Sequence, residues 1–262
     1  MLPSPSRILP LALFTSLLLG ASGCAGTPEG PPVRREVPTS EGFTSLEVDD
    51  LDVEVRLGLE HRVSLRCDPE LAPYARVSVV GDALRAELKG EPMRIMGGDR
   101  TCVVDVSMPS LRSVRVEGSG DVRVIGAAEG LQSVALQGSG DARFDDAKGE
   151  ATRFELTGSG DLKLRRLEAK RADFSVSGSG DVQIVGGAVA AASLHCSGSG
   201  DVDAAALVAD AAEVHASGSG GVRLTARRSA DIDVSGSGDV VIAGGPSACH
   251  AHSSGSGEAL CR

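Results

Sequence analysis

The triplet Gly-Ser-Gly recurs through the second half of this 262-residue chain and limits its fold more than any other feature. It begins at residues 118, 138, 158, 178, 198, 218, 236 and 255. Successive copies are 20 residues apart up to residue 218, and then 18 and 19 residues apart. Such a period predicts a stack of similar units, because one unit alone could not bury its apolar side chains.

Each unit has a short run of alternating apolar and polar residues on either side of the triplet, as in half-buried strands. The apolar positions of successive units align in four columns, two before the triplet and two after it. The first column consists of Val114, Val134, Phe154, Phe174, Leu194, Val214, Ile232 and Ala251. We therefore predict an all-β parallel β-helix, a solenoid with coils of about 20 residues that pair in register. A β-sandwich or an up-and-down barrel would not require such uniform repeats.

The glycines of the triplet predict a sharp bend in every coil. A glycine can adopt a positive φ, and it can also lie against the next coil at the strand spacing of about 4.8 Å. We expect the triplets to stack, and we call each one a glycine corner.

The first 40 residues have the character of a targeting segment followed by a tether. An apolar run of twelve residues follows Arg7 and is too short to span a bilayer. The small residues before Cys24 resemble the lipobox of bacterial lipoproteins, although Ala21 stands where leucine is usual. We predict a lipoprotein signal peptide over 1–23, a lipid on Cys24 and a Pro-rich tether over 24–40. An ordinary signal peptide is the alternative.

Residues 41–262 form the predicted β-helix domain, with irregular coils over 41–110 and repeat coils over 111–262. Export implies an oxidising compartment, in which cysteines pair. Proximity favours Cys67 with Cys102 and Cys249 with Cys261, although spacing alone leaves the connectivity open. Cys196 falls in an apolar column and is expected to be a buried small residue rather than a nucleophile.

A family resemblance rests on the stretches "GFTSLEVDDLDVEVRLG" and "PSLRSVRVEGSGDV" and on the iterated Gly-Ser-Gly-Asp that follows them. Over residues 42 to about 260 the chain resembles the putative auto-transporter adhesin, head GIN domain family. The resemblance implies a right-handed β-helix in an exported or lipid-anchored bacterial protein. We expect a location in the cell envelope, at the outer membrane.

Composition excludes some function classes. The net charge is −10 and aromatic residues are 2% of the chain, so we expect no nucleic-acid partner. Carbohydrate-active β-helix enzymes use long loops and aromatic subsites, whereas these repeats vary by two residues at most. We therefore predict no enzymatic activity, and keep a carbohydrate-active enzyme as the less favoured alternative.

An acidic residue follows most glycine corners. The column consists of Asp121, Asp141, Asp161, Asp181, Asp201, Asp239 and Glu258, interrupted by Gly221. Stacked carboxylates would repel one another by roughly 0.9 kcal/mol per neighbouring pair even in water. Calcium could offset this repulsion. The favoured interpretation is that the carboxylates accept hydrogen bonds at the turn, beside basic neighbours.

A second polar cluster contains metal-ligand residue types in the last four coils. One outward column holds His195, His215, Asp233 and His252, and the next holds Glu213, Asp231 and His250. Imidazole and carboxylate groups from adjacent coils could close around zinc. The alternative is a solvated polar face near the end of the solenoid.

These observations predict a non-catalytic, lipid-anchored envelope protein that acts as an adhesin or surface scaffold. Its partners would be the membrane, through the N-terminal lipid, and an unknown surface glycan or protein. A metal-dependent binding protein, using the histidine cluster, is the alternative.

Overall fold

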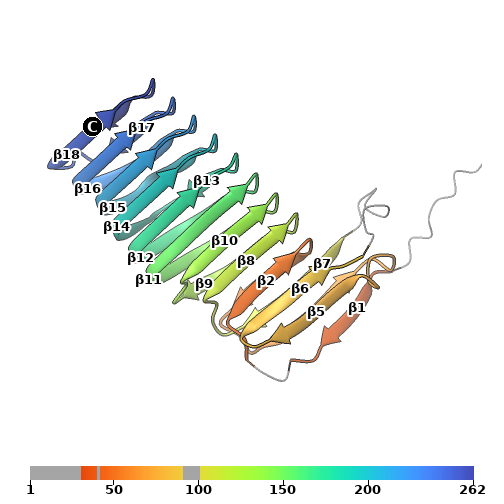
Figure 1. The fold of residues 1–262 in the computed structure, drawn as a ribbon. Coiled ribbons are helices and arrows are strands. Elements are labelled where there is room, and N and C mark those ends of the chain that lie inside the picture. The colour runs from red at the N-terminus through yellow and green to blue at the C-terminus, as the bar shows by residue number, and fades with distance from the viewer. Residues whose placement is uncertain (1–30, 40–41, 91–100) are drawn as a thin grey trace, which may run out of the picture. The chain divides into compact units, whose positions relative to one another are not determined.

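Stacked coils make up the structure, as predicted. The computed structural model describes residues 31–39, 42–90 and 101–262, and in these residues nineteen strands form one continuous sheet that winds into a β-solenoid (Figure 1). The predicted signal peptide and Cys24 lie outside the described residues. Within the described part of the chain, no helix is long and apolar enough to cross a membrane.

The strands that lead into the glycine corners form one wall of the coils, which we call the entry face. It contains residues 113–117 and their parallel partners, with Val114 beside Val134 and Val134 beside Phe154. Its repeat strands are β8 (Ser113–Gly118), β10 (Ser133–Gly138), β14 (Gly187–Cys196), β18 (Ala248–Ser253) and the second halves of four long strands, β11 (Ala142–Gly158), β12 (Leu162–Val176), β15 (Val202–Ala216) and β16 (Val222–Val234).

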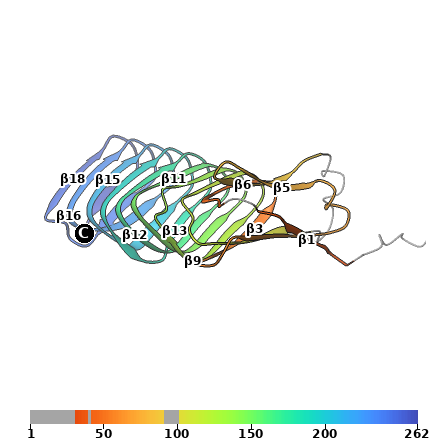
Figure 2. The ribbon, with the colours of Figure 1, turned by 90° about the horizontal axis from the view of Figure 1, so that it is seen from below.

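The strands that follow the corners form the opposite wall, the exit face. It contains residues 122–125 and their partners, with Val122 beside Ala142 and Ala142 beside Leu162. Figure 2 shows the two faces as opposite walls of flattened coils. The exit face is built from β9 (Val122–Glu129), β13 (Val182–Ile184), β17 (Val240–Ala243), β19 (Ala259–Cys261) and the first halves of the four long strands.

Aliphatic side chains fill the space between the two faces. Along most strands buried and exposed residues alternate, as the period of two requires, whereas β18 is exposed throughout. The rings of Phe154 and Phe174 stack in neighbouring coils with centroids 4.7 Å apart. Most outward residues are polar, so each face offers rows of like-placed side chains to solvent.

Close approach explains why each corner needs two glycines. A Cβ on Gly140 would lie 2.1 Å from the carbonyl oxygen of Gly120, and one on Gly138 would lie 2.2 Å from that of Gly118. Gly138 also has a positive φ of 130°, whereas Gly140 does not lie in the left-handed region. Any larger residue would therefore push the coils apart at the point where Ser139 N–H donates to the carbonyl of Gly118, at 2.8 Å.

The N-terminal region adds layers out of chain order. Strands β2 (Ser45–Asp49) and β3 (Asp52–Leu57) form a layer that pairs in parallel with β8 and β9. On its other side the same layer pairs in parallel with β6 (Ala83–Leu88) and β7 (Cys102–Met108). Residues 45–57 thus lie between segments that both come later in the chain.

Antiparallel strands complete this end, within the region where we expected irregular coils over 41–110. Strand β5 (Ala75–Val80) pairs antiparallel with β6, and β4 (Arg62–Cys67) pairs antiparallel with β7. Strand β1 (Val33–Val37), which we expected within the tether, pairs antiparallel with β4. The physical reason is that β1 satisfies backbone groups along an edge of β4 that would otherwise stay open.

Two disulfides lie at the two ends of the stack. Cys67 is bonded to Cys102, which joins β4 to β7. Cys249 is bonded to Cys261, which joins β18 to β19 in the last coil. Cys196 is a free, buried cysteine.

Candidate functional site

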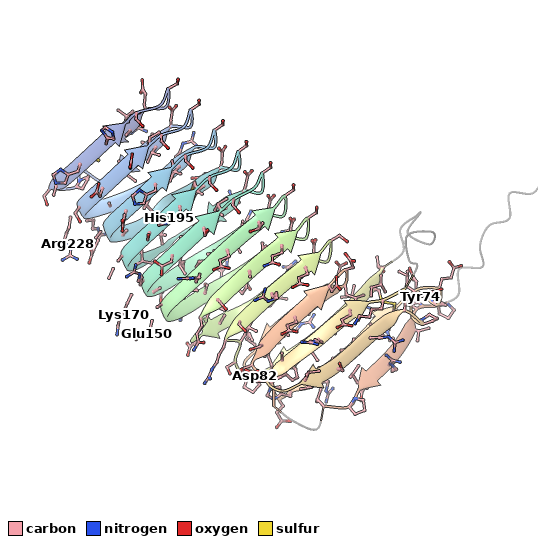
Figure 3. The ribbon with its side chains drawn as sticks, in the orientation of Figure 1. Tyr74, Asp82, Glu150, Lys170, His195 and Arg228 are labelled. Atoms are coloured by element: carbon pink, nitrogen blue, oxygen red, sulfur yellow. A yellow bond between two sulfur atoms is a disulfide. The ribbon has the colours of Figure 1, made fainter. Side chains whose placement is uncertain are left out.

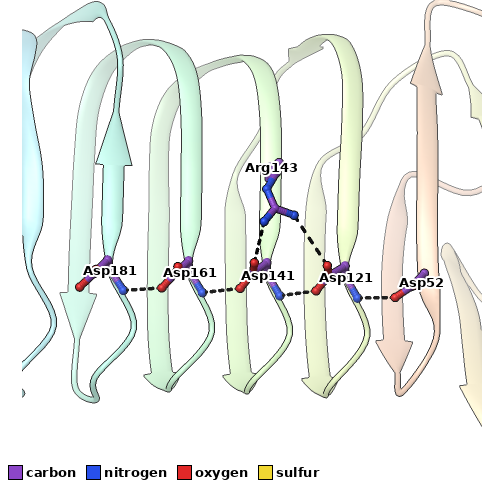
Figure 4. A network of polar contacts seen from close by, with 6 residues as sticks. All are labelled: Asp52, Asp121, Asp141, Arg143, Asp161 and Asp181. Atoms are coloured by element: carbon purple, nitrogen blue, oxygen red, sulfur yellow. Dashed lines mark hydrogen bonds and ion pairs between the residues drawn. The ribbon is translucent and has the colours of Figure 1, made fainter. Parts of the chain in front are cut away.

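The aspartates after the corners form a hydrogen-bonded ladder along the exit face (Figure 4). The backbone N–H of Asp141 donates to Oδ1 of Asp121 at 2.9 Å, and that of Asp161 donates to Oδ1 of Asp141 at 2.9 Å. The ladder begins at Asp52, whose Oδ1 accepts from Asp121 N–H at 3.0 Å. It continues through Asp181 and Asp201 to the N–H of Gly221, at 2.7 Å.

The hydrogen bonds of the ladder offset the repulsion expected between stacked carboxylates. Along the ladder, the Asp carboxylates turn one oxygen to the backbone of the next coil, as the hydrogen-bonding interpretation predicts. Arg143 lies between two rungs, with Nη2 2.7 Å from Asp141 Oδ2 and Nη1 3.7 Å from Asp121 Oδ2. Gly221 has no carboxylate for the next coil, and the pattern resumes where Glu258 N–H donates to Asp239 Oδ1 at 2.9 Å.

A shallow hollow runs beside this ladder across five successive coils. Its volume is about 440 Å³. The strand register places a second row of side chains beside the ladder, which consists of Arg143, Lys163, Gln183, Asp203 and Arg223. The residues that line it are Asp141, Arg143, Asp161, Leu162, Lys163, Asp181, Val182, Gln183, Asp201, Asp203 and Arg223. We call this hollow the exit-face groove.

The predicted histidine cluster lies on the entry face, where Figure 3 shows His195. The register places His195 beside His215 and His215 beside Asp233, and Asp233 is followed by His252. Glu213, Asp231 and His250 form the neighbouring column in the same way. The structure thus brings the seven residues into the two predicted columns.

Only some neighbouring side chains of the histidine cluster are in contact with one another. The rings of His195 and His215 have centroids 5.0 Å apart, and His215 Nε2 lies 3.2 Å from Glu213 Oε1. The side chains of His250 and His252 lie exposed on the last entry-face strand. Among the described residues, no group of three or more His, Cys, Asp or Glu side chains is arranged to hold a metal ion.

Cys196 lies beneath the histidines and points into the core. Burial raises the pKa of its thiol to about 11, so the thiol is protonated at neutral pH. The protonated form is a poor nucleophile. The position agrees with the expectation that Cys196 is a buried small residue.

An acidic cluster near the N-terminal layers was not predicted from the sequence. Burial, and then the neighbouring charges of Asp50, Glu117 and Glu87, raise the pKa of Asp49. A hydrogen bond to Glu47 raises the pKa of Arg85 in the same region. These residues are far apart in sequence and meet only because β2 lies between β6 and β8, so no local pattern could have indicated them.

Comparison with known proteins finds the same fold in solved bacterial structures. A lipid binding protein from Parabacteroides distasonis, described as putative, is 22% identical, with a TM-score of 0.76 over 88% of this chain and 97% of that chain. A putative adhesin from the same species is 18% identical, with a TM-score of 0.75 over 88% of this chain and 98% of that chain. A putative adhesin from Parabacteroides merdae is 16% identical, with a TM-score of 0.73 over 88% and 97%.

At these identities the similarity shows the fold alone, and no curated protein matches the chain. Neither the family nor these neighbours are described as enzymes. The family match extends over residues 42–246, from the layer of β2 and β3 to the last bend before β18. The chain therefore belongs to the family described as putative auto-transporter adhesin, head GIN domain.

Proposed function

We propose that this protein is an exported, non-catalytic adhesin or surface scaffold, anchored to the bacterial envelope by a lipid on Cys24. Membership of an adhesin family supports a place outside the cytoplasm. The predicted signal peptide over residues 1–23 and the small residues before Cys24 support the anchor. The solenoid would then extend away from the membrane on the Pro-rich segment that precedes β1.

The exit-face groove is the observation that carries the proposal. Five successive coils contribute side chains of similar placement to it, and its polar groups repeat once per coil. A repeating surface suits an extended, repeating ligand such as a surface glycan or an extended protein segment. Each coil would add one weak polar contact, and many such contacts along one ligand sum to a stable attachment.

The groups lining the groove suit binding better than catalysis. Its lining contains neither histidine nor cysteine, so a nucleophile paired with an imidazole base is absent from this part of the described structure. The ladder aspartates use Oδ1 to hold the next coil, which fixes their position and orients Oδ2 as an acceptor. A row of fixed acceptors with Lys163 and Arg223 as donors can recognise hydroxyl groups or backbone amides.

The binding test uses the full chain with Cys24→Ala, probed against arrays of surface glycans and of envelope and matrix proteins. We expect a ligand whose affinity falls at least tenfold in the groove variants Lys163→Glu and Asp181→Asn. The Asn variant keeps an oxygen for the ladder while removing the charge. The control is Arg153→Glu, on the entry face, which should bind as the parent does. Equal binding by all variants, or turnover of a polysaccharide, would contradict the proposal.

The anchor has a separate test. In cells, the parent chain should fractionate with membranes, whereas Cys24→Ala should appear in the soluble fraction, because the lipid provides the only hydrocarbon that the proposal invokes. Membrane association that persists in Cys24→Ala would refute the lipid anchor and leave the groove unaffected.

A further inference from the structure

Two histidines on the entry face lie at a separation that suits two imidazoles bound to one metal ion. Strands β14, β15 and β16 place His195, His215 and Asp233 side by side in register. The two imidazole centroids are 5.0 Å apart, and the ring planes are inclined by 38°. All three side chains are exposed and line one hollow of about 190 Å³.

This separation is the one that a shared metal ion requires. Zinc–nitrogen bonds are about 2.0–2.1 Å long, and the centre of an imidazole lies roughly 1.1 Å beyond its ligating nitrogen. Two imidazoles on one tetrahedral ion therefore have centres roughly 5 Å apart. The backbone already provides this spacing for His195 and His215, so only ring rotation is needed to direct one nitrogen of each ring at a common point.

The neighbouring carboxylates can orient one imidazole ring and provide a third ligand. Glu213 Oε1 lies 3.2 Å from Nε2 of His215. A carboxylate that holds one ring nitrogen orients the imidazole and leaves its other nitrogen to bind the metal. Asp233 follows His215 in the same row, and because its side chain is exposed, rotation about its side-chain bonds can bring an oxygen to the ion.

The geometry points to a two-imidazole site for a divalent transition-metal ion such as zinc, with His195 and His215 as ligands. Asp233 supplies a third ligand after rotation, water completes the coordination, and Glu213 is a positioning residue. The side chains as they stand do not converge as a group of three, so the bound ion itself draws Asp233 in. This site is independent of the exit-face groove and of the proposed adhesion.

His250 and His252 provide a matched control within the same cluster. The coil that carries Asp231 and Asp233 separates them from His215. They lie on the terminal strand β18, beside the Cys249–Cys261 disulfide. A site that depended only on a high local density of imidazole would include them, whereas the proposed site does not.

The test is titration of the untagged full chain with zinc chloride by calorimetry, and with cobalt(II) chloride by visible absorption. We expect one ion per chain and a loss of at least tenfold in affinity for His195→Ala and for His215→Ala. Glu213→Gln should weaken binding several-fold, while the double variant His250→Ala with His252→Ala should bind as the parent does. Calcium chloride should give no heat, because imidazole is a poor calcium ligand.

Nuclear magnetic resonance of the unaltered chain gives a second measurement that needs no folded variant. Substoichiometric cobalt(II) should shift the ring signals of His195 and His215. It should leave in place those of His61, which packs against Phe43 in the N-terminal region. Absence of binding by the parent chain would overturn the inference. So would binding that survives in both single variants, or binding that the terminal double variant removes.

Discussion

The two regions of the solenoid keep their layers together by different means. In the repeat coils over 111–262, glycine corners connect each coil to the next in chain order, and the Asp ladder does the same except after Gly221. In the N-terminal layers, Asp50 and Leu51 take the place of the glycine corner, and Asp50 has a positive φ of 55°. Its Oδ1 accepts from Ser119 N–H at 2.8 Å.

The difference shows that uniform stacking and end closure need different chemistry. A glycine corner can be stacked without limit, because each corner is complementary to another copy of itself. The antiparallel strands β1, β4 and β5 and the Cys67–Cys102 disulfide stop that repetition at one end. Charged residues Arg34, Arg35 and Glu36 on the outermost strand β1 discourage pairing with a further strand.

Removing the N-terminal disulfide should have the largest effect on stability. Cys67→Ser with Cys102→Ser opens a link between residues 35 apart and should cost about 4 kcal/mol of unfolding free energy. Cys249→Ser with Cys261→Ser opens a link of 12 residues and should cost about 3 kcal/mol. Urea denaturation followed by circular dichroism measures both values. A larger loss for the C-terminal pair would reverse the comparison.

A methyl group in a glycine corner should have the next largest effect. Gly140→Ala places a Cβ against the carbonyl oxygen of Gly120 and should cost about 3 kcal/mol by overpacking. The control is Gly130→Ala, where no atom lies within 4 Å of the new Cβ and only the positive φ of 78° opposes it. The control should cost about 1 kcal/mol. Equal losses in thermal denaturation would show that close contact between coils does not make Gly140 more sensitive to a methyl group than a turn glycine with open space around it.

Breaking one rung of the ladder should have a smaller effect. Asp141→Ala leaves the N–H of Asp161 without its acceptor and should cost about 2 kcal/mol. Asp141→Asn retains an oxygen acceptor and should cost less than half as much. The same denaturation experiment distinguishes them. If both variants lost equal stability, the charge pair with Arg143 would be the dominant contribution rather than the ladder bond.

Cys196 should have the smallest effect at neutral pH and a visible one at alkaline pH. Burial raises the pKa of the folded thiol to about 11, above its ordinary value of 9.0, so the folded state binds the proton more tightly. Its contribution to stability is complete below pH 9 and is lost as pH rises toward 11. Cys196→Ala should therefore lose less stability than the parent over that interval. A parallel decline in both chains would contradict the assignment.

Periodicity predicted the repeat region well, because one residue pattern recurs there in every coil. The aligned apolar columns indicated the parallel pairing, and the register of His195 with His215 followed from it directly. The hydrogen-bond direction of the Asp ladder was among the predicted alternatives. These features depend on near neighbours in the stack, which the period itself specifies.

The N-terminal layers could not be predicted in the same way. Their strands alternate as strongly as the repeats, but alternation does not say which strand is the partner of which. The sequence therefore did not predict that β2 pairs with both β6 and β8, and it did not predict the charged residues around Asp49. Side-chain convergence at His195 and His215 is likewise decided by rotamers, on which a sequence pattern has no bearing.

The out-of-order layer has a consequence for how the chain acquires its structure. Strands β2 and β3 emerge early during synthesis, yet each of them lies between partners that are made afterwards. Strands β2 and β3 can pair with β6 and β7 once residue 108 is available, but their pairing with β8 and β9 must wait until residue 125 is made. A nascent chain of this kind therefore stays incompletely folded for longer than one that folds coil by coil from its first residue.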